Sequence, residues 1–232
     1  MQGEIRPGRF QVLPSVIKNL IIINALVWLA QITIGRDIIP MSDLFALHYV
    51  KSVFYKPWQF LTYMFMHDPG NILHILFNMF ALWMFGSTLE NLWGTRRFLL
   101  FYLLCGLGAG FIQVLAMGVD MSRLADLYNS GQISDETFYG NMNIPVLGAS
   151  GAIMGIFAAF AFTFPNSQLF ILPIPFPIKA KWALLGMVAF DLFGGISSRQ
   201  GAGIAHFAHI GGAVIGIIMV LIWNRKNRRT FY

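Results

Sequence analysis

The feature that most constrains this chain is a series of apolar stretches, each close to the roughly 20 residues that an α-helix needs to cross a bilayer. These stretches occupy residues 17–35, 71–89, 98–117, 146–164, 176–193 and 204–223. With 56% hydrophobic and 11% charged residues, the chain carries more apolar surface than a soluble domain of this size can bury. The sequence therefore predicts an all-α, polytopic membrane protein. Its six spanning helices form one domain (17–223), between a polar N-terminal segment (1–16) and a basic tail (224–232).

The distribution of charged residues predicts how these helices are oriented. If the N-terminus lies inside, the inner connections hold most of the 16 Lys and Arg residues, and the outer ones hold most of the 10 Asp and Glu residues. This asymmetry satisfies the positive-inside rule, so we expect both termini in the cytoplasm. The compact form favours the cytoplasmic membrane of a bacterium. Of the two long outer connections, 36–70 is rich in aromatic residues and is expected partly in the interface, whereas the polar 118–145 is expected to be solvated.

Composition and spacing exclude several classes of function. The formal net charge is +6, but the basic residues are scattered between apolar stretches instead of lining one face, so no nucleic-acid partner is expected. The single cysteine, Cys105, excludes a disulfide framework and a CxxC pair. The histidines lack an HExxH pattern and have no cysteine or carboxylate cluster beside them, so we expect neither a metal nor a cofactor.

Polar side chains inside apolar stretches are costly in lipid, so each of them is a candidate for function. The outstanding ones are His74, Asn78, Ser150, His206 and His209. In the predicted topology the second, fourth and sixth helices all run from outside to inside, and these residues lie in their first turns. At about 1.5 Å of rise per residue, Ser150 and His209 are expected at a similar depth near the outer face.

The surroundings of Ser150 and His209 suit a nucleophile and its base. Ser150 lies in GASGAIMG, where Gly148 and Gly151 leave its hydroxyl unobstructed at a helix start. A serine needs a neutral imidazole within reach to take its proton, and His209 in AHIGGAVIG is at the matching depth. His206, three residues earlier, either shapes the site or sits near the membrane interface. Taken singly, Ser150 also fits a packing serine, and His209 fits an interhelical hydrogen bond.

His74 and Asn78 are four residues apart and therefore stack on one face of their helix. Acyl transfer builds negative charge on the carbonyl oxygen of the substrate, and Asn or His donors placed there stabilise it. As an alternative, the pair holds the second helix to a neighbour. Asp191 is the one acidic residue near the right depth to orient His209, and we place it at the rim. We therefore predict a Ser150/His209 dyad that is held by geometry rather than by a carboxylate.

At these residues the chain resembles the rhomboid family of intramembrane serine proteases, over roughly residues 55–222. The stretch HILFNMFALWMFGSTLENLWGTRRFLLFYLLCGLGAG is similar to the family's second and third helices, GASGAIMG to its GxSG motif, and DLFGG with AHIGGAVIG to its fifth and sixth helices. The resemblance implies a six-helix bundle with Ser150 as nucleophile and His209 as general base. It also implies that His74, Asn78 and the Ser150 amide bind the oxyanion, and that Glu90 has a structural role near the inner end of the second helix.

Two positions depart from the family pattern. Trp58 is followed by Gln59 where an arginine is common, which predicts looser anchoring of the first outer loop. Met154 stands where many members carry an aromatic ring, so a thioether is expected to contact the imidazole. We expect both departures to affect rate and substrate preference rather than the type of reaction.

The predicted activity is hydrolysis of peptide bonds in single-pass or multi-pass membrane proteins whose transmembrane segment unwinds near the outer face of the bilayer. Two alternatives come from other classes. A noncatalytic rhomboid-like protein would bind membrane clients, although such relatives usually lack the serine or the histidine. A transporter or channel would need a polar track across the membrane, whereas the inner halves of the three helices (MFALWMF, IFAAFAF and IGIIMVLIW) are apolar.

Overall fold

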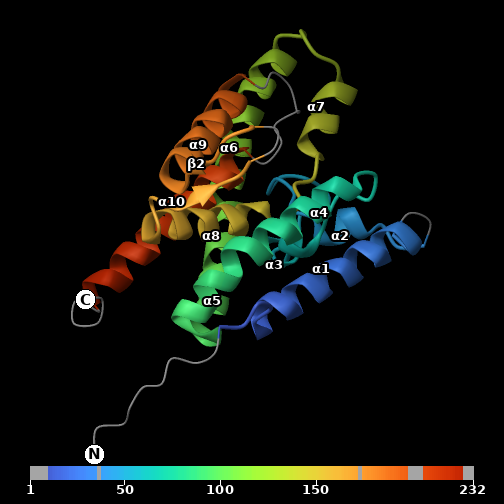
Figure 1. The fold of residues 1–232 in the computed structure, drawn as a ribbon. Coiled ribbons are helices and arrows are strands. Elements are labelled where there is room, and N and C mark those ends of the chain that lie inside the picture. The colour runs from blue at the N-terminus through green and yellow to red at the C-terminus, as the bar shows by residue number, and fades with distance from the viewer. Residues whose placement is uncertain (1–9, 36–37, 172–173, 198–205, 227–232) are drawn as a thin grey trace, which may run out of the picture.

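A computed structural model of the protein describes residues 10–35, 38–171, 174–197 and 206–226 (Figure 1). The helices are, in chain order, α1 (Ser15–Thr33), α2 (Met41–Phe45), α3 (Gln59–Thr62), η1 (Tyr63–Phe65), α4 (Ile72–Ala81), η2 (Leu82–Gly86), α5 (Ser87–Trp93), α6 (Thr95–Asn129), α7 (Asp135–Met142), α8 (Ser150–Thr163), α9 (Ala180–Ser197) and α10 (His206–Lys226). Two strands of two residues each, β1 (Gln168–Leu169) and β2 (Ile178–Lys179), pair antiparallel before α9. The predicted helical fold is therefore confirmed, with this short strand pair as an addition.

Parts of the predicted N-terminal segment, of the basic tail and of the start of the sixth span lie outside the described residues. Within the described part, four stretches are long and apolar enough to cross a membrane: Ser15–Thr33, Ile72–Trp93, Thr95–Asn129 and His206–Asn224. The second of these joins α4, the π-helical turn η2 and α5. The predicted fourth and fifth spans correspond to the shorter apolar helices α8 and α9. The fifth begins later than the predicted residue 176, because the residues before Ala180 form β2.

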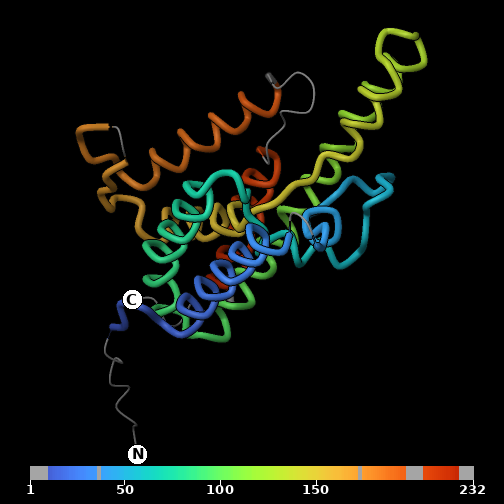
Figure 2. The backbone as a smooth tube through the Cα atoms, turned by 90° about the vertical axis from the view of Figure 1, so that its right-hand side faces the viewer, coloured from blue at the N-terminus to red at the C-terminus, as the bar shows by residue number. Residues whose placement is uncertain are grey.

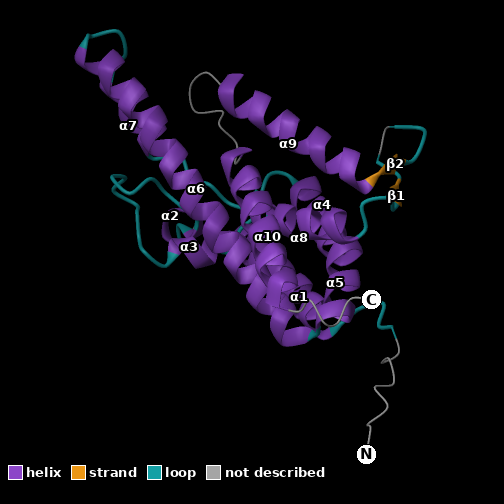
Figure 3. Ribbon diagram, turned by 90° about the vertical axis from the view of Figure 1, so that its left-hand side faces the viewer, coloured by secondary structure: helices purple, strands orange, loops and turns teal. Residues whose placement is uncertain are grey.

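Helix α8 lies at the centre of the bundle and packs against α6 and α10 (Figure 3). Every residue from 151 to 161 is buried, and the helix has no polar side chain after Ser150 until Thr163. A helix that is apolar on all sides is stable only when protein or lipid surrounds it completely. Its 14 residues give a length of about 21 Å, shorter than the hydrocarbon core of a bilayer.

Glycines set the close approach of α8 and α10. A Cβ at Gly155 would lie 2.5 Å from Cys105 Sγ and 2.8 Å from the Gly212 carbonyl oxygen, and a Cβ at Gly216 would lie 2.5 Å from the Gly155 carbonyl oxygen. A Cβ at Gly212 would overlap the carbonyl oxygen of Gly151. Small residues allow helix backbones to touch in membranes, where lipid tails remove the hydrophobic drive between helices. Glycines therefore form the contact between these two helices.

The structural role expected for Glu90 is visible at the start of α1. Glu90 is 3% exposed, and its two carboxylate oxygens accept the backbone N–H groups of Val16 and Ile17, each at 3.0 Å. The first N–H groups of a helix have no partner within the helix, and Pro14 before α1 supplies no side-chain cap. Glu90 therefore caps α1 from α5 and fixes the two helices to each other at this end of the bundle.

The loop at 38–70 is anchored by Gln59, contrary to the loose anchoring predicted for this position. Gln59 is fully buried; its Nε2 donates to the carbonyl oxygens of Asp43 at 3.0 Å and Phe54 at 2.9 Å, and its Oε1 accepts the His48 N–H at 3.2 Å. A side-chain amide both donates and accepts, so this one buried residue satisfies two carbonyl oxygens and one N–H where the loop backbone folds back on itself. Trp58 is half exposed and donates from Nε1 to the Leu44 carbonyl at 2.9 Å.

The connection predicted at 118–145 is largely helical. The predicted third span ends at residue 117, but α6 continues to Asn129 and reaches a length of 35 residues. α7 then folds back against it, with the rings of Tyr128 and Phe138 stacked 4.7 Å apart. This α6–α7 hairpin projects from the bundle at the end opposite to the start of α1 and the end of α10 (Figure 2). The polar sequence of the hairpin is compatible with the solvent exposure that we predict for it. Its backbone N–H and C=O groups are hydrogen-bonded within α6 and α7 and do not form an extended loop.

Candidate active site

Ser150 is the first residue of α8, and the turn that delivers it requires a glycine. Gly148 has a φ of 128°, in the region that side chains other than glycine rarely adopt. A Cβ at this position would lie 3.1 Å from His74 Nε2 and 3.6 Å from Ser150 Oγ. The Gly148 N–H donates to the Tyr63 carbonyl at 3.0 Å, which joins this turn to η1. The predicted role of Gly148 in leaving the serine accessible therefore has a conformational basis as well as a steric one.

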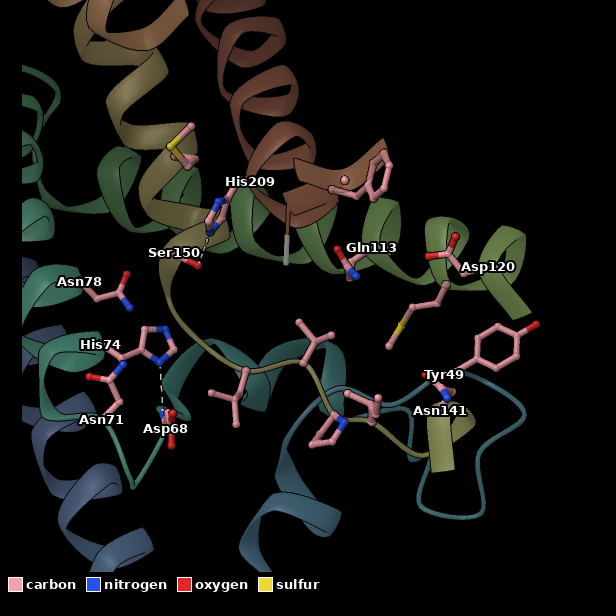
Figure 4. Close-up of a pocket in the computed structure, with 18 of the residues that line it drawn as sticks. Tyr49, Asp68, Asn71, His74, Asn78, Gln113, Asp120, Asn141, Ser150 and His209 are labelled. Carbon is pink, nitrogen blue, oxygen red and sulfur yellow. Dashed lines mark hydrogen bonds between the residues drawn. The ribbon is translucent and has the colours of Figure 1, made fainter. Parts of the chain in front are cut away.

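Ser150 and His209 meet across the glycine-mediated contact of α8 and α10. Ser150 Oγ lies 2.8 Å from His209 Nε2 (Figure 4). Gly151, the next residue, leaves room for this contact, because a Cβ there would lie 2.7 Å from Ala109 Cβ and 3.4 Å from the Ala208 carbonyl oxygen. The structure thus brings together the two residues that the sequence pairs only by depth.

Asp191 on α9 accepts hydrogen bonds from two histidines, which corrects its predicted place at the rim. Asp191 is 4% exposed; its Oδ1 lies 3.0 Å from His209 Nδ1 and 2.8 Å from His206 Nδ1, and its Oδ2 lies 3.2 Å from His209 Nδ1. A carboxylate only accepts, so Nδ1 of His209 carries the proton and Nε2 is free to accept the Ser150 hydroxyl. The expectation that geometry alone holds His209 is therefore wrong. Between the two roles left open for His206, the structure favours shaping the site.

His74 and Asn78 project from α4 on the side of the cavity opposite Ser150 and His209 (Figure 4). His74 Nδ1 accepts the Asp68 backbone N–H at 3.3 Å, which leaves Nε2 as the protonated nitrogen of the neutral ring. That nitrogen is the one nearest to Gly148. Asn78 is 6% exposed, and its amide lies at the cavity wall. Both side chains can therefore offer an N–H to a group bound beside Ser150.

The cavity around these side chains has a volume of about 1240 Å³. Besides the four residues above, its lining includes Met154 near Ser150 and, toward the α6–α7 hairpin, Tyr49, Asp120, Leu124, Leu127 and Asn141. Met154 is 4% exposed, so the thioether fills the position where the sequence pattern leads one to expect a ring. Trp58 is not among the described residues that line the cavity.

Gln113 is a site residue that the sequence reasoning misses. It lies on α6, is 4% exposed and lines the cavity, and its Oε1 accepts the Ala208 N–H in the first turn of α10 at 3.0 Å. This bond satisfies an N–H that has no partner within its helix and fixes the height of α10 beside α6. A lone polar residue in the apolar stretch 98–117 is the signal that could have found it, of the same kind that singles out His74 and Asn78.

Comparison with known proteins agrees with this helical membrane architecture. The family described as Rhomboid domain matches residues 55–226, and the chain belongs to the rhomboid family. It is therefore an integral membrane protein.

Individual relatives cover the chain to different extents. Rhomboid protease AarA of Providencia stuartii is 28% identical over 215 residues, which cover 88% of this chain and 71% of that protein. The mitochondrial presenilin-associated rhomboid-like protein of Homo sapiens is 34% identical over 164 residues, covering 68% of this chain and 37% of that protein. The mitochondrial rhomboid protein 1 of Saccharomyces cerevisiae is 29% identical over 145 residues, covering 62% and 36%. The chain thus spans little more than a third of these two mitochondrial relatives.

Proposed function

We propose that this protein is an intramembrane serine endopeptidase in which Ser150 is the nucleophile and His209 the general base. The observation that carries the proposal is the 2.8 Å distance between Ser150 Oγ and His209 Nε2, at the wall of a cavity that also receives His74 and Asn78. Similarity to a relative named as a rhomboid protease adds support. A serine that only packs between helices needs no imidazole nitrogen within hydrogen-bonding distance, no pair of N–H donors nearby and no cavity beside it.

In the proposed acylation, His209 Nε2 accepts the hydroxyl proton while Ser150 Oγ attacks the carbonyl carbon of the scissile bond. The carbonyl oxygen becomes negative, and the N–H groups of His74 and Asn78 face the position where it forms. One well-placed donor of this kind contributes roughly 2.7–4 kcal/mol to the stability of the transition state. When the C–N bond breaks, the leaving amine takes the proton from His209.

In the proposed deacylation, water enters the cavity and attacks the ester that joins the substrate to Ser150. His209 accepts a proton from this water and returns it to Oγ, which restores the free enzyme. The polar lining toward the α6–α7 hairpin supplies a route for water that the apolar inner halves of the helices do not. No metal or cofactor takes part in this scheme.

The proposed substrates are membrane proteins, single-pass or multi-pass, whose transmembrane segment unwinds beside the cavity. A helical substrate keeps its carbonyl oxygens bonded within the helix, so only an extended segment exposes a carbonyl carbon to Ser150. We therefore expect small and helix-breaking residues around the cleavage site. With the N-terminus inside, the cavity opens toward the outer face of the membrane. The cytoplasmic membrane of a bacterium stays our prediction for its location, and the mitochondrial names of several relatives give that prediction no support.

The proposal is tested by cleavage of a model transmembrane substrate in liposomes, with the wild type beside Ser150→Ala and His209→Ala. Labelling by a fluorophosphonate reports the nucleophile independently of substrate choice. We expect both cleavage and labelling to be lost in the two variants, while thermal unfolding shows that they fold. A wild type that leaves several unwound substrates intact and takes no label would argue for the noncatalytic, client-binding alternative.

A further inference from the structure

We propose that Asp191 is a positioning residue for His209, and that His206 in turn holds Asp191, so that the site acts as a Ser150–His209–Asp191 triad with a fourth supporting residue. This inference rests on the proposed function, because positioning matters only if His209 acts as a base. It replaces the two-residue dyad with a network drawn from three helices.

The buried carboxylate of Asp191 lies between two imidazoles. The Asp191 side chain is 6% exposed, and the side chains of His206 and His209 are 12% and 22% exposed. A carboxylate removed from water is costly unless its oxygens accept hydrogen bonds. Here Oδ1 receives both histidines, at 2.8 Å and 3.0 Å, and Oδ2 receives His209 at 3.2 Å. The two rings therefore fix both the position and the rotation of the carboxylate.

Asp191 also bears on the tautomer of His209. A neutral imidazole carries one proton, and a base for Ser150 must carry it on Nδ1 so that Nε2 has a free electron pair. Without the carboxylate, the proton can move to Nε2, where it would meet the Ser150 hydroxyl as a competing donor. Asp191 accepts from Nδ1 and so selects the productive tautomer, while it also prevents rotation of the ring.

The local sequence places Asp191 where α9 and α10 touch. Gly194 and Gly195 follow Asp191 by three and four residues and therefore share its helix face. A Cβ at Gly194 would lie 2.7 Å from His206 Cε1, and a Cβ at Gly195 would lie 2.9 Å from Phe207 Cε2. The segment DLFGG thus places a carboxylate beside two glycines. The first turn of α10 packs against these glycines, and His206 contacts Gly194.

The test compares Asp191→Asn, which keeps the shape but not the charge, with Asp191→Glu, which keeps the charge, and with His206→Gln. We expect Asp191→Asn to lower kcat and the rate of fluorophosphonate labelling by roughly 10²- to 10⁴-fold, with KM changed only a few-fold. Asp191→Glu should recover part of this loss. His206→Gln replaces the fixed ring donor by a flexible amide donor, so it should hold the carboxylate less firmly and lower kcat by about tenfold or less. The control Asp126→Asn removes an exposed carboxylate outside the site and should match the wild type.

Two results would overturn the proposal. The first is wild-type kcat and labelling in a folded Asp191→Asn. The second is an equal loss of kcat in Asp191→Asn and Asp191→Glu that is matched by an equal fall in their unfolding temperatures. If Asp191→Asn does not fold, ¹⁵N-histidine NMR of the wild type decides, with His209→Gln to assign the signal. A proton on Nδ1 of His209 supports the proposal, and a proton on Nε2 refutes it. Because this measurement needs no turnover, it separates failure of the positioning role from failure of the protease function.

Discussion

Replacement of Gly212 by alanine is the perturbation that tests most directly how the bundle holds its site together. The Cβ of alanine at this position would overlap the Gly151 carbonyl oxygen, whereas ordinary contacts begin near 3.4 Å. The nearest neighbours on α8 are backbone atoms, so no side chain can turn away to make room. The two helices must therefore separate by about 1 Å or more, since packed interiors have little free space to absorb the methyl group.

This separation acts on Ser150 and His209 because each lies within three residues of the overlapping pair, Gly151 and Gly212. Their hydrogen bond of 2.8 Å would lengthen beyond the range of an effective bond. A displacement of this size costs roughly 10²-fold in rate. Overpacking also costs roughly 1–3 kcal/mol of stability, so the variant should fold but unfold at a lower temperature.

The assay is kcat/KM for cleavage in liposomes, with thermal unfolding in detergent measured on the same preparations. Gly186→Ala is the matched control, because a methyl group on this glycine of α9 would have nothing within 4 Å and should be tolerated. We expect kcat/KM to fall about 10²-fold in Gly212→Ala and to stay unchanged in Gly186→Ala. A folded Gly212→Ala with wild-type kcat/KM would refute the reasoning that close packing of α8 and α10 sets the geometry of the site.

Three further predictions concern parts of the molecule that support the site. Glu90→Ala leaves the Val16 and Ile17 N–H groups without their cap, and should lower the free energy of unfolding by roughly 1–3 kcal/mol for each N–H group. Glu90→Gln keeps one acceptor and should lower it less. Thermal unfolding of the two variants checks this. Burial and the neighbouring His74 lower the pKa of His67 to about 4 from 6.5, so the folded state resists protonation. The stability that depends on neutral His67 is complete above pH 6.5 and is lost as the pH falls toward 4, by up to about 3 kcal/mol. The unfolding temperature of the wild type should therefore fall more steeply over this range than that of His67→Phe, and parallel curves would contradict the assignment. Gln59→Leu leaves the Asp43 and Phe54 carbonyl oxygens without the amide donor of Gln59. Limited proteolysis by an added protease should then cut the loop at 38–70 faster than in the wild type, while it cuts the rest of the chain at an unchanged rate.

Several features of the protein follow from the sequence alone because they depend on local composition. Apolar stretches of the right length predict spanning helices, and polar residues inside them mark the site whatever the details of packing. Depth predicts the pairing of Ser150 with His209, since residues in the first turns of helices that run in the same direction share a level. The glycines around Gly151 and Gly212 indicate close helix contact, because small residues let helix backbones approach each other in membranes.

Other features required the tertiary structure, because they depend on how helices cross and rotate. Depth along a helix can be counted from the sequence, but the direction in which Asp191 points depends on the rotation of α9 against α10. The bonds of Gln59 to backbone groups up to 16 residues away depend on how the loop at 38–70 folds. The extension of α6 beyond the apolar stretch also escapes prediction, since the polar residues after 117 are compatible with both helix and loop until α7 packs against them. Sequence determined which residues the bundle must place at one level, and the tertiary structure decided which of them touch, because contact depends on angles between helices that no local pattern encodes.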